Sequence, residues 1–229
     1  MYGTGAIPRL GNTLGRMICV VKATHALPLA LTAARAAAGP VLLAVATVPA
    51  HASPAILVAL LVLAFVSDVL DGVIARRLGI ATATLRRLDS VADSIFYVCA
   101  AAVAWRLHPQ ALTDRLVPLS VLVALELARY VVDYARYRRE ASYHMWSSKA
   151  WGACLFIGFV ALLGFGHTGG LVSLAVYAGI AADLEGLAIS LVLDEWHHDV
   201  PTVFHALRLR RDARRRGPPA APPPPASQG

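Results

Sequence analysis

The chain has 229 residues, of which 57% are hydrophobic and only 15% are charged, and its formal net charge is +7. A typical soluble domain has about a quarter of its residues charged, so this composition excludes an ordinary soluble globular protein and indicates a polytopic membrane protein. The three cysteines, Cys19, Cys99 and Cys154, are scattered through the chain and are predicted to be small core residues with no disulfide or metal role.

Residues 1–26 mix basic and apolar side chains, a pattern typical either of an amphipathic juxtamembrane segment or of a leader without fixed structure. The first candidate span follows at residues 27–50. This run is longer than the core of a signal peptide, about 7–15 residues, and Arg35 interrupts it, so we expect no cleavage. If Arg35 faces the interior of a helix bundle, it either helps to hold a phosphate or pairs with an acidic side chain.

Four aspartates lie at, or directly beyond, the adjoining ends of the second and third candidate spans, residues 54–70 and 89–107. The polar connector between them contains Gly79 and can reverse the chain. Helical spacing of i, i+3 and of i, i+4 places each pair of acids on one helix face. Two antiparallel helices would then direct four carboxylates at one another, an arrangement that favours divalent cations such as Mg²⁺, Mn²⁺ or Ca²⁺ over Zn²⁺. The acids are Asp68, Asp71, Asp89 and Asp93.

Three further apolar segments are predicted to span the membrane, at residues 116–133, 150–166 and 170–193. The first of these carries Glu126, Arg129 and Asp133 on one face, where they line the bundle interior or pair among themselves. The predicted fold is therefore all-α, a polytopic membrane bundle of six transmembrane helices. We assign residues 27–199 to this domain and residues 200–229 to a basic arm with a proline-rich tail, disordered from residue 218 onwards.

The basic residues are distributed unevenly over the predicted loops. Seventeen of the 21 lysines and arginines fall on one side of a six-span arrangement, together with both termini and the four aspartates. Since cytoplasmic loops carry an excess of lysine and arginine, this side is predicted to be cytosolic, in a bacterial-type cytoplasmic membrane. The membrane is the partner that this charge pattern indicates, and we expect no nucleic-acid partner.

At the four aspartates the sequence resembles the CDP-alcohol phosphotransferases, also called CDP-alcohol phosphatidyltransferases, which are integral membrane enzymes. Their signature is D-x2-D-G-x2-A-R, about eight residues, then G-x3-D-x3-D. Seven of its eight fixed positions match, and Leu85 stands where the family has its second glycine. The first helix of the family carries a Thr-x-x-Arg element, which Thr32 and Arg35 match loosely. The matching positions are Asp68, Asp71, Gly72, Ala75, Arg76, Asp89 and Asp93.

The resemblance implies an activity and a set of ligands. A CDP-linked lipid such as CDP-diacylglycerol would donate its phosphatidyl group to the hydroxyl of a small polar alcohol, and CMP would leave. The resemblance implies two Mg²⁺ or Mn²⁺ ions as cofactors and a homodimer as the assembly. The phospholipid product would place the enzyme in lipid biosynthesis.

The resemblance also implies roles for individual residues. Asp68, Asp71 and Asp89 would bind metal, and Asp93 would share a metal and act as the general base on the incoming hydroxyl. The cytidine diphosphate would contact the residues Gly72, Ala75 and Arg76. An acceptor that carries a phosphate, such as glycerol 3-phosphate or inositol phosphate, would be held by basic residues of later helices, for which Arg129 and Lys149 are the candidates.

Other readings of the acid cluster stay open. A membrane cation carrier also binds ions with buried acids, although it has no need of Gly72 and Arg76 beside them. A catalytically inactive relative of the family is a further alternative, for which Leu85 is the argument. A membrane prenyltransferase is disfavoured because its aspartate-rich motifs lie on widely separated helices, whereas here 21 positions separate Asp68 from Asp89.

Overall fold

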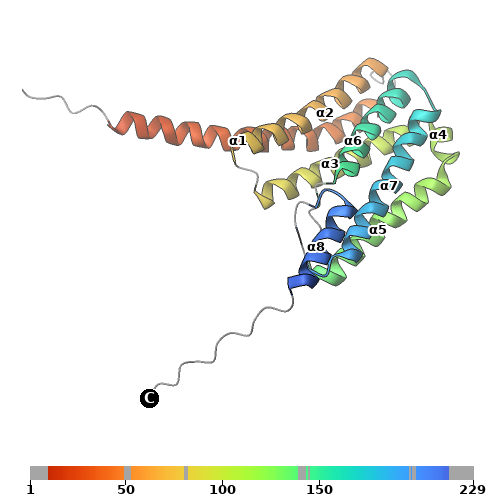
Figure 1. Cartoon of the computed structure of the whole chain (residues 1–229). Coiled ribbons are helices and arrows are strands. Elements are labelled where there is room, and N and C mark those ends of the chain that lie inside the picture. The colour runs from red at the N-terminus through yellow and green to blue at the C-terminus, as the bar shows by residue number, and fades with distance from the viewer. Residues whose placement is uncertain are drawn as a thin grey trace, which may run out of the picture. The chain divides into compact units, whose positions relative to one another are not determined.

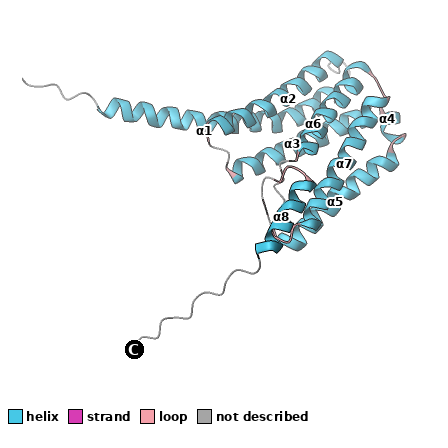
Figure 2. Cartoon of the chain, in the orientation of Figure 1, coloured by secondary structure: helices cyan, strands magenta, loops and turns pink. Residues whose placement is uncertain are grey.

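The structure is a computed structural model in which every regular element of the described chain is a helix (Figures 1 and 2). This confirms the predicted all-α class. The chain divides into two compact units, Met1–Ala111 with Phe159–Thr168, and Leu112–Gly158 with Gly169–Gly229. The domain limits expected at residues 26 and 199 stay predictions, and the expected disorder of residues 218–229 falls outside the described residues. The structure describes residues 10–48, 53–79, 82–138, 143, 145–195, 197 and 200–216.

The helices of the first unit extend beyond the spans expected from the sequence. Helix α1 is continuous from Leu10 to Thr47, so it begins well before residue 27. The second helix begins with a proline at its first turn, where no N–H is needed. The unit contains α1 (Leu10–Thr47), α2 (Pro54–Arg77), α3 (Ala83–Leu107) and η1 (Val160–Gly164), and α4 (Pro109–Thr113) begins at its end.

The connector between α2 and α3 is shorter than the sequence predicts. Thr82 lies before the first residue of α3, and its hydroxyl oxygen accepts a hydrogen bond from the backbone N–H of Leu85 at 3.2 Å. Because this cap satisfies an otherwise unpaired donor, α3 begins six residues before Asp89. Gly79 in the connector has a φ of +67°, a conformation that glycine adopts without steric cost. The short connector keeps the two acid pairs close together.

Helix α1 packs against both α2 and α3. Arg35 and Gly39 of α1 lie beside Asp93 and Phe96 of α3, in the same order along both helices, so α1 and α3 run parallel. The two backbones approach closely at Gly39, where an added Cβ would lie 3.0 Å from the Phe96 Cα and 3.2 Å from the Ile95 carbonyl oxygen. Small residues permit such approaches between membrane helices.

We expect Gly39→Ala to destabilise the first unit. The new methyl group would meet backbone atoms of α3, which cannot rotate away, so the helices must separate at a cost of about 1–3 kcal/mol. Thermal unfolding of the purified protein in detergent measures the effect. Gly152→Ala is the matched control, because its added Cβ has no atom within 4 Å apart from its chain neighbours and the nearby backbone of its own helix. Equal melting temperatures for the two variants would contradict the close packing of α1 on α3.

The second unit is built on two parallel helices, α5 (Leu116–Tyr137) and α7 (Gly170–Val192). At one end Arg115 donates to the Ser173 hydroxyl at 2.9 Å and to the Gly169 carbonyl at 3.0 Å. At the other end the Tyr137 hydroxyl lies 2.8 Å from the Leu193 carbonyl oxygen. These contacts fix the two helices side by side along their whole length. The unit also contains α6 (Trp146–Phe159) up to Gly158, and α8 (Val203–Arg216).

Within the described residues, five helices are long and apolar enough to cross a membrane, as expected of an integral membrane protein. Their outward faces carry large apolar side chains, such as Leu63 of α2 and Val98 of α3, which are 64% and 68% exposed. Helix α5 does not meet this apolar criterion, since it carries Glu126, Arg129 and Asp133. Five of the six predicted spans are therefore supported. The five segments are Leu27–Thr47, Pro54–Arg77, Arg87–Leu107, Trp146–Gly164 and Gly170–Val192.

Candidate metal centre

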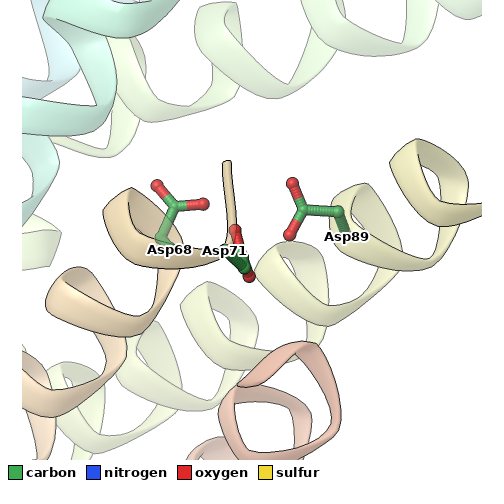
Figure 3. Close-up of side chains that lie close together, drawn as sticks. All are labelled: Asp68, Asp71 and Asp89. Atoms are coloured by element: carbon green, nitrogen blue, oxygen red, sulfur yellow. The ribbon is translucent and has the colours of Figure 1, made fainter. Parts of the chain in front are cut away.

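Three of the four motif aspartates come together where the end of α2 meets the start of α3. One carboxylate oxygen from each of Asp68, Asp71 and Asp89 lies within 4.8 Å of the others. Figure 3 shows Asp68 and Asp89 facing the space between the two helices, with Asp71 between them. The Asp71 side chain is only 5% exposed, whereas those of Asp68 and Asp89 are 43% and 34% exposed. The cluster is therefore buried at Asp71 and accessible to solvent at Asp68 and Asp89, which form its open side.

Arg35 of α1 lies at the centre of the acid cluster and contacts all four aspartates. Its Nη1 lies 2.6 Å from Asp68 Oδ1 and its Nη2 lies 2.7 Å from Asp89 Oδ1. The same two nitrogens also pair with Asp93 and Asp71 respectively. The Arg35 side chain is 1% exposed, and a buried guanidinium is tolerated only where it is paired with opposite charge. The sequence left open whether Arg35 would pair with one acid or hold phosphate, and it pairs with all four.

Thr32 lies one turn before Arg35 and faces the same cluster. Its hydroxyl donates to the Pro28 carbonyl at 3.0 Å, and its oxygen lies 3.5 Å from Asp71 Oδ2. Both polar side chains of the Thr-x-x-Arg element of α1 therefore point at the acids that α2 and α3 supply.

Asp93 occupies a different place from the other acids. It lies one turn further along α3 than Asp89, and its side chain is 37% exposed. It pairs with Arg35, but the group of three acids that could share one metal ion does not include it. Its exposure is similar to that of Asp68 and Asp89, so Asp93 differs from them only in lying outside the group of three.

The chemistry of this donor set fits a divalent cation. Carboxylate oxygens are hard ligands, which suit Mg²⁺, Mn²⁺ and Ca²⁺. Four ionised aspartates against one guanidinium leave a formal charge of about −3, so a further positive charge on the open side is electrostatically favoured. The cluster of Asp68, Asp71 and Asp89 could therefore hold a metal ion.

The other motif residues of α2 lie on two sides of the helix. Ala75 is buried with 6% exposure, whereas Arg76 is exposed. Gly72 is half-buried, and an added Cβ there would lie 3.5 Å from the Arg76 Nη1. The Arg76 guanidinium therefore lies over Gly72, on the turn that follows Asp68. Leu85, the departure from the signature, is half-buried in the first turn of α3.

The second unit contains a separate polar cluster around Arg129. Its Nη2 lies 2.8 Å from Glu126 Oε1 within α5, and its Nε lies 3.7 Å from Asp183 Oδ1 of α7. Pairing of Glu126 with Arg129 was one of the two expected arrangements. The sequence carried no signal for the contact with Asp183, because it depends on the packing of α5 on α7. Two carboxylates thus already face Arg129, and Asp183 is 1% exposed.

Asp133 and Lys149 lie elsewhere in the second unit. Asp133 is buried and accepts a hydrogen bond from the Ser190 hydroxyl at 2.5 Å. Lys149 is exposed at the start of α6, and its Nζ lies 4.8 Å from the centre of the Trp146 ring. The structure thus leaves Lys149 accessible, whereas Arg129 is engaged by acids.

The fold and the acid cluster together define a multi-span membrane protein with a candidate divalent-metal centre. Residues 25–189 match the family model of CDP-alcohol phosphatidyltransferase, and this match covers more than half of the chain. The chain belongs to this family and is a membrane-bound transferase of phospholipid synthesis. Searches of curated proteins and of solved structures found no match.

Proposed function

We propose that the protein transfers a phosphatidyl group from a CDP-linked lipid, such as CDP-diacylglycerol, to the hydroxyl of a small polar alcohol, and releases CMP. The observation that carries this proposal is the gathering of Asp68, Asp71 and Asp89 within 4.8 Å, inside a region that matches the family model. Membership of the family favours this enzyme over a cation carrier. The alternative that the protein is an inactive member of the family is tested by the assay of CMP release described below.

The chemistry follows from the positions of the acids. The alcohol oxygen forms a bond to the phosphorus that carries the lipid, and the bond from this phosphorus to the CMP oxygen breaks. Asp93 accepts the proton of the alcohol, and its accessible position beside the cluster but outside the group of three possible metal ligands supports this role. Asp68, Asp71 and Asp89 would hold two Mg²⁺ or Mn²⁺ ions, with Asp93 as a shared ligand, and the ions would neutralise the diphosphate and align the attacking and leaving oxygens.

The donor and the acceptor are assigned to different residues. Gly72, Ala75 and Arg76 contact the cytidine diphosphate in this proposal, and the exposed Arg76 guanidinium supplies a phosphate contact. Lys149 and Arg129 are the candidates for the phosphate of an acceptor such as glycerol 3-phosphate or inositol phosphate. The accessibility of Lys149 supports it more strongly, because two carboxylates already compensate Arg129.

We also propose α5 as the sixth span. It lies parallel to α7, a candidate span, and is fixed to it at both ends by the contacts of Arg115 and Tyr137. A helix attached at both ends to a membrane span lies across the same thickness of the membrane. Its charged residues Arg129 and Asp133 pair with Asp183 and Ser190 of α7. Six spans place both termini and the acid cluster on the cytosolic side, where cytidine nucleotides and Mg²⁺ occur. The homodimer stays a proposal on the resemblance alone.

A reporter fused after Gly229 tests this topology. We expect alkaline phosphatase at this position to be inactive and a fluorescent protein that folds only in the cytosol to be bright, because the basic residues of α8 retain the C-terminus inside. The reverse pattern would contradict the six-span arrangement. The same reporters placed after Ala111 of α4 are the control, since the segment between the third and fourth spans lies on the opposite side in the six-span arrangement and should give the opposite readings.

The activity is tested with the purified protein and CDP-diacylglycerol. We expect CMP to appear only when Mg²⁺ or Mn²⁺ and a suitable alcohol are both present, and a panel of free and phosphorylated alcohols identifies the acceptor. Mass spectrometry of the lipid product identifies the bond that formed. If no alcohol in the panel supports CMP release from a protein that binds Mn²⁺, the chain is an inactive relative and the proposal fails.

A further inference from the structure

Helix α8 presents a continuous face of exposed arginines and apolar side chains. At 3.6 residues per turn, Phe204, Leu207 and Arg211 lie close together on this face, and three more arginines flank them. Phe204 is 71% exposed and Leu207 is 47% exposed. Together these residues occupy about 120° of the helix circumference. The α8 face comprises Phe204, Leu207, Arg208, Arg211, Arg214 and Arg215, all of them exposed.

The opposite face of α8 is held against the rest of the second unit. Ala206 is fully buried in a core cluster that includes Ile189 and Leu193 at the end of α7, and Leu209 packs against the same cluster. The backbone N–H of Val203 donates to Glu185 Oε1 of α7 at 3.1 Å. Arg210 lies at the edge of this contact, with its Nε 3.4 Å from Asp194 Oδ2. The α8 face is therefore the side of a docked helix that its own unit leaves uncovered.

The attachment to α7 fixes the depth of α8 in a membrane. Helix α7 has 23 residues and is about 35 Å long, which exceeds the hydrocarbon thickness of about 30 Å. The C-terminal end of α7, around Val192, therefore reaches the boundary of the headgroup layer. Glu185 and Ile189 lie within the last two turns of α7 and contact Val203 and Ala206, so the start of α8 lies near the boundary between the acyl chains and the headgroups.

We propose that the α8 face binds the anionic lipid headgroups of the leaflet in which α7 ends. The four arginines supply charge complementary to phosphate, while Phe204 and Leu207 enter the boundary of the acyl chains, as in other interfacial helices. Each arginine near an anionic surface strengthens binding by about fivefold. The proposal does not depend on the transferase activity, since α8 follows the last span and contributes no residue to the acid cluster.

The test places a nitroxide label at one of two exposed positions of α8 in the full-length protein, one within the α8 face and one beside it. The native cysteines are replaced by alanine, and Leu207→Cys or Asp212→Cys carries the label, Asp212 being an exposed residue next to the α8 face. Each protein is reconstituted in vesicles of phosphatidylcholine alone and of phosphatidylcholine with phosphatidylglycerol. Collision of the label with oxygen, which concentrates in lipid, and with a water-soluble nickel complex is measured. Thermal unfolding confirms that each labelled protein is folded.

We expect the label at 207 to gain oxygen collisions and to lose nickel collisions several-fold when phosphatidylglycerol is present, while the label at 212 stays in water. Combined replacement of Arg208, Arg211, Arg214 and Arg215 by glutamine should abolish the change at 207. The proposal is overturned if position 207 remains in water in anionic vesicles, or if its immersion is equal in neutral vesicles. Loss of both collision types at 207 on raising the protein-to-lipid ratio would instead assign the face to a second copy of the chain. CMP release, measured in parallel, reports separately on the proposed activity.

Discussion

Replacing Asp93 by asparagine is expected to lower the rate of CMP release by about 10²–10⁴-fold, while the protein still folds and binds metal. Asparagine has nearly the shape of aspartate and keeps an oxygen toward Arg35, but it cannot accept the proton of the alcohol. The group of three acids that could hold a metal, Asp68, Asp71 and Asp89, is unchanged in this variant. The measurement pairs CMP release with Mn²⁺ binding followed by electron paramagnetic resonance.

Asp71→Asn is the matched comparison for Asp93→Asn. Asp71 is the most buried acid of the cluster and one of its three possible metal ligands, so we expect this variant to lose Mn²⁺ binding together with activity. If Asp93→Asn retains turnover, Asp93 is not the base. If Asp93→Asn loses Mn²⁺ as completely as Asp71→Asn does, Asp93 acts chiefly as a ligand.

Arg35→Gln is expected to have the largest effect on stability when no divalent cation is present. Arg35 pairs with all four aspartates, and removal of one partner from a buried ion pair costs about 3–5 kcal/mol because the remaining charge is uncompensated. Without Arg35 the four carboxylates repel one another across α2 and α3. The melting temperature in EDTA should therefore fall well below that of the wild type.

Divalent cations should rescue Arg35→Gln more than they stabilise the wild type. A metal ion and the Arg35 guanidinium are both attracted to the same carboxylates, so removal of the guanidinium leaves the metal without a competitor. The measurement compares the shift in melting temperature between EDTA and Mg²⁺ for the two proteins. Arg35→Lys is the control. Lysine keeps the positive charge, but its single ammonium group lacks the two separate nitrogens with which Arg35 contacts the four carboxylates. Equal shifts for wild type and Arg35→Gln would show that Arg35 and the metal do not compete.

The sequence was sufficient to locate the acid cluster. The spacing of Asp68 and Asp71, and of Asp89 and Asp93, fixes which helix face each pair occupies, and only 21 positions separate Asp68 from Asp89. The sequence also singled out Arg35 as a charged residue within an apolar span. It could not reveal that one guanidinium reaches all four acids, since this depends on the approach of α1 to α3 at Gly39, a contact between segments far apart in the chain.

Helix ends and helix pairing were harder to predict. The α3 helix begins earlier than expected because the Thr82 cap outweighs the polar composition of the residues that follow. The polar face of α5 was recognised, but its partners Asp183 and Ser190 lie on α7, more than fifty residues away, and no local pattern indicates them. The periodicity of a sequence indicates which face of a helix is polar. Which helix packs against that face is decided by the tertiary structure.

The attachment of α5 to α7 at both ends restricts how this part of the chain can change in evolution. An inserted residue between Arg115 and Tyr137 would turn one end of α5 by about 100° and shift it by about 1.5 Å relative to the other end. Either the contact with Ser173 or the contact with the Leu193 carbonyl would then be lost, and Arg129 would turn away from Asp183. Length variation among relatives should therefore be confined to the stretches before Arg115 and after Arg138, while the helix itself keeps a fixed number of residues.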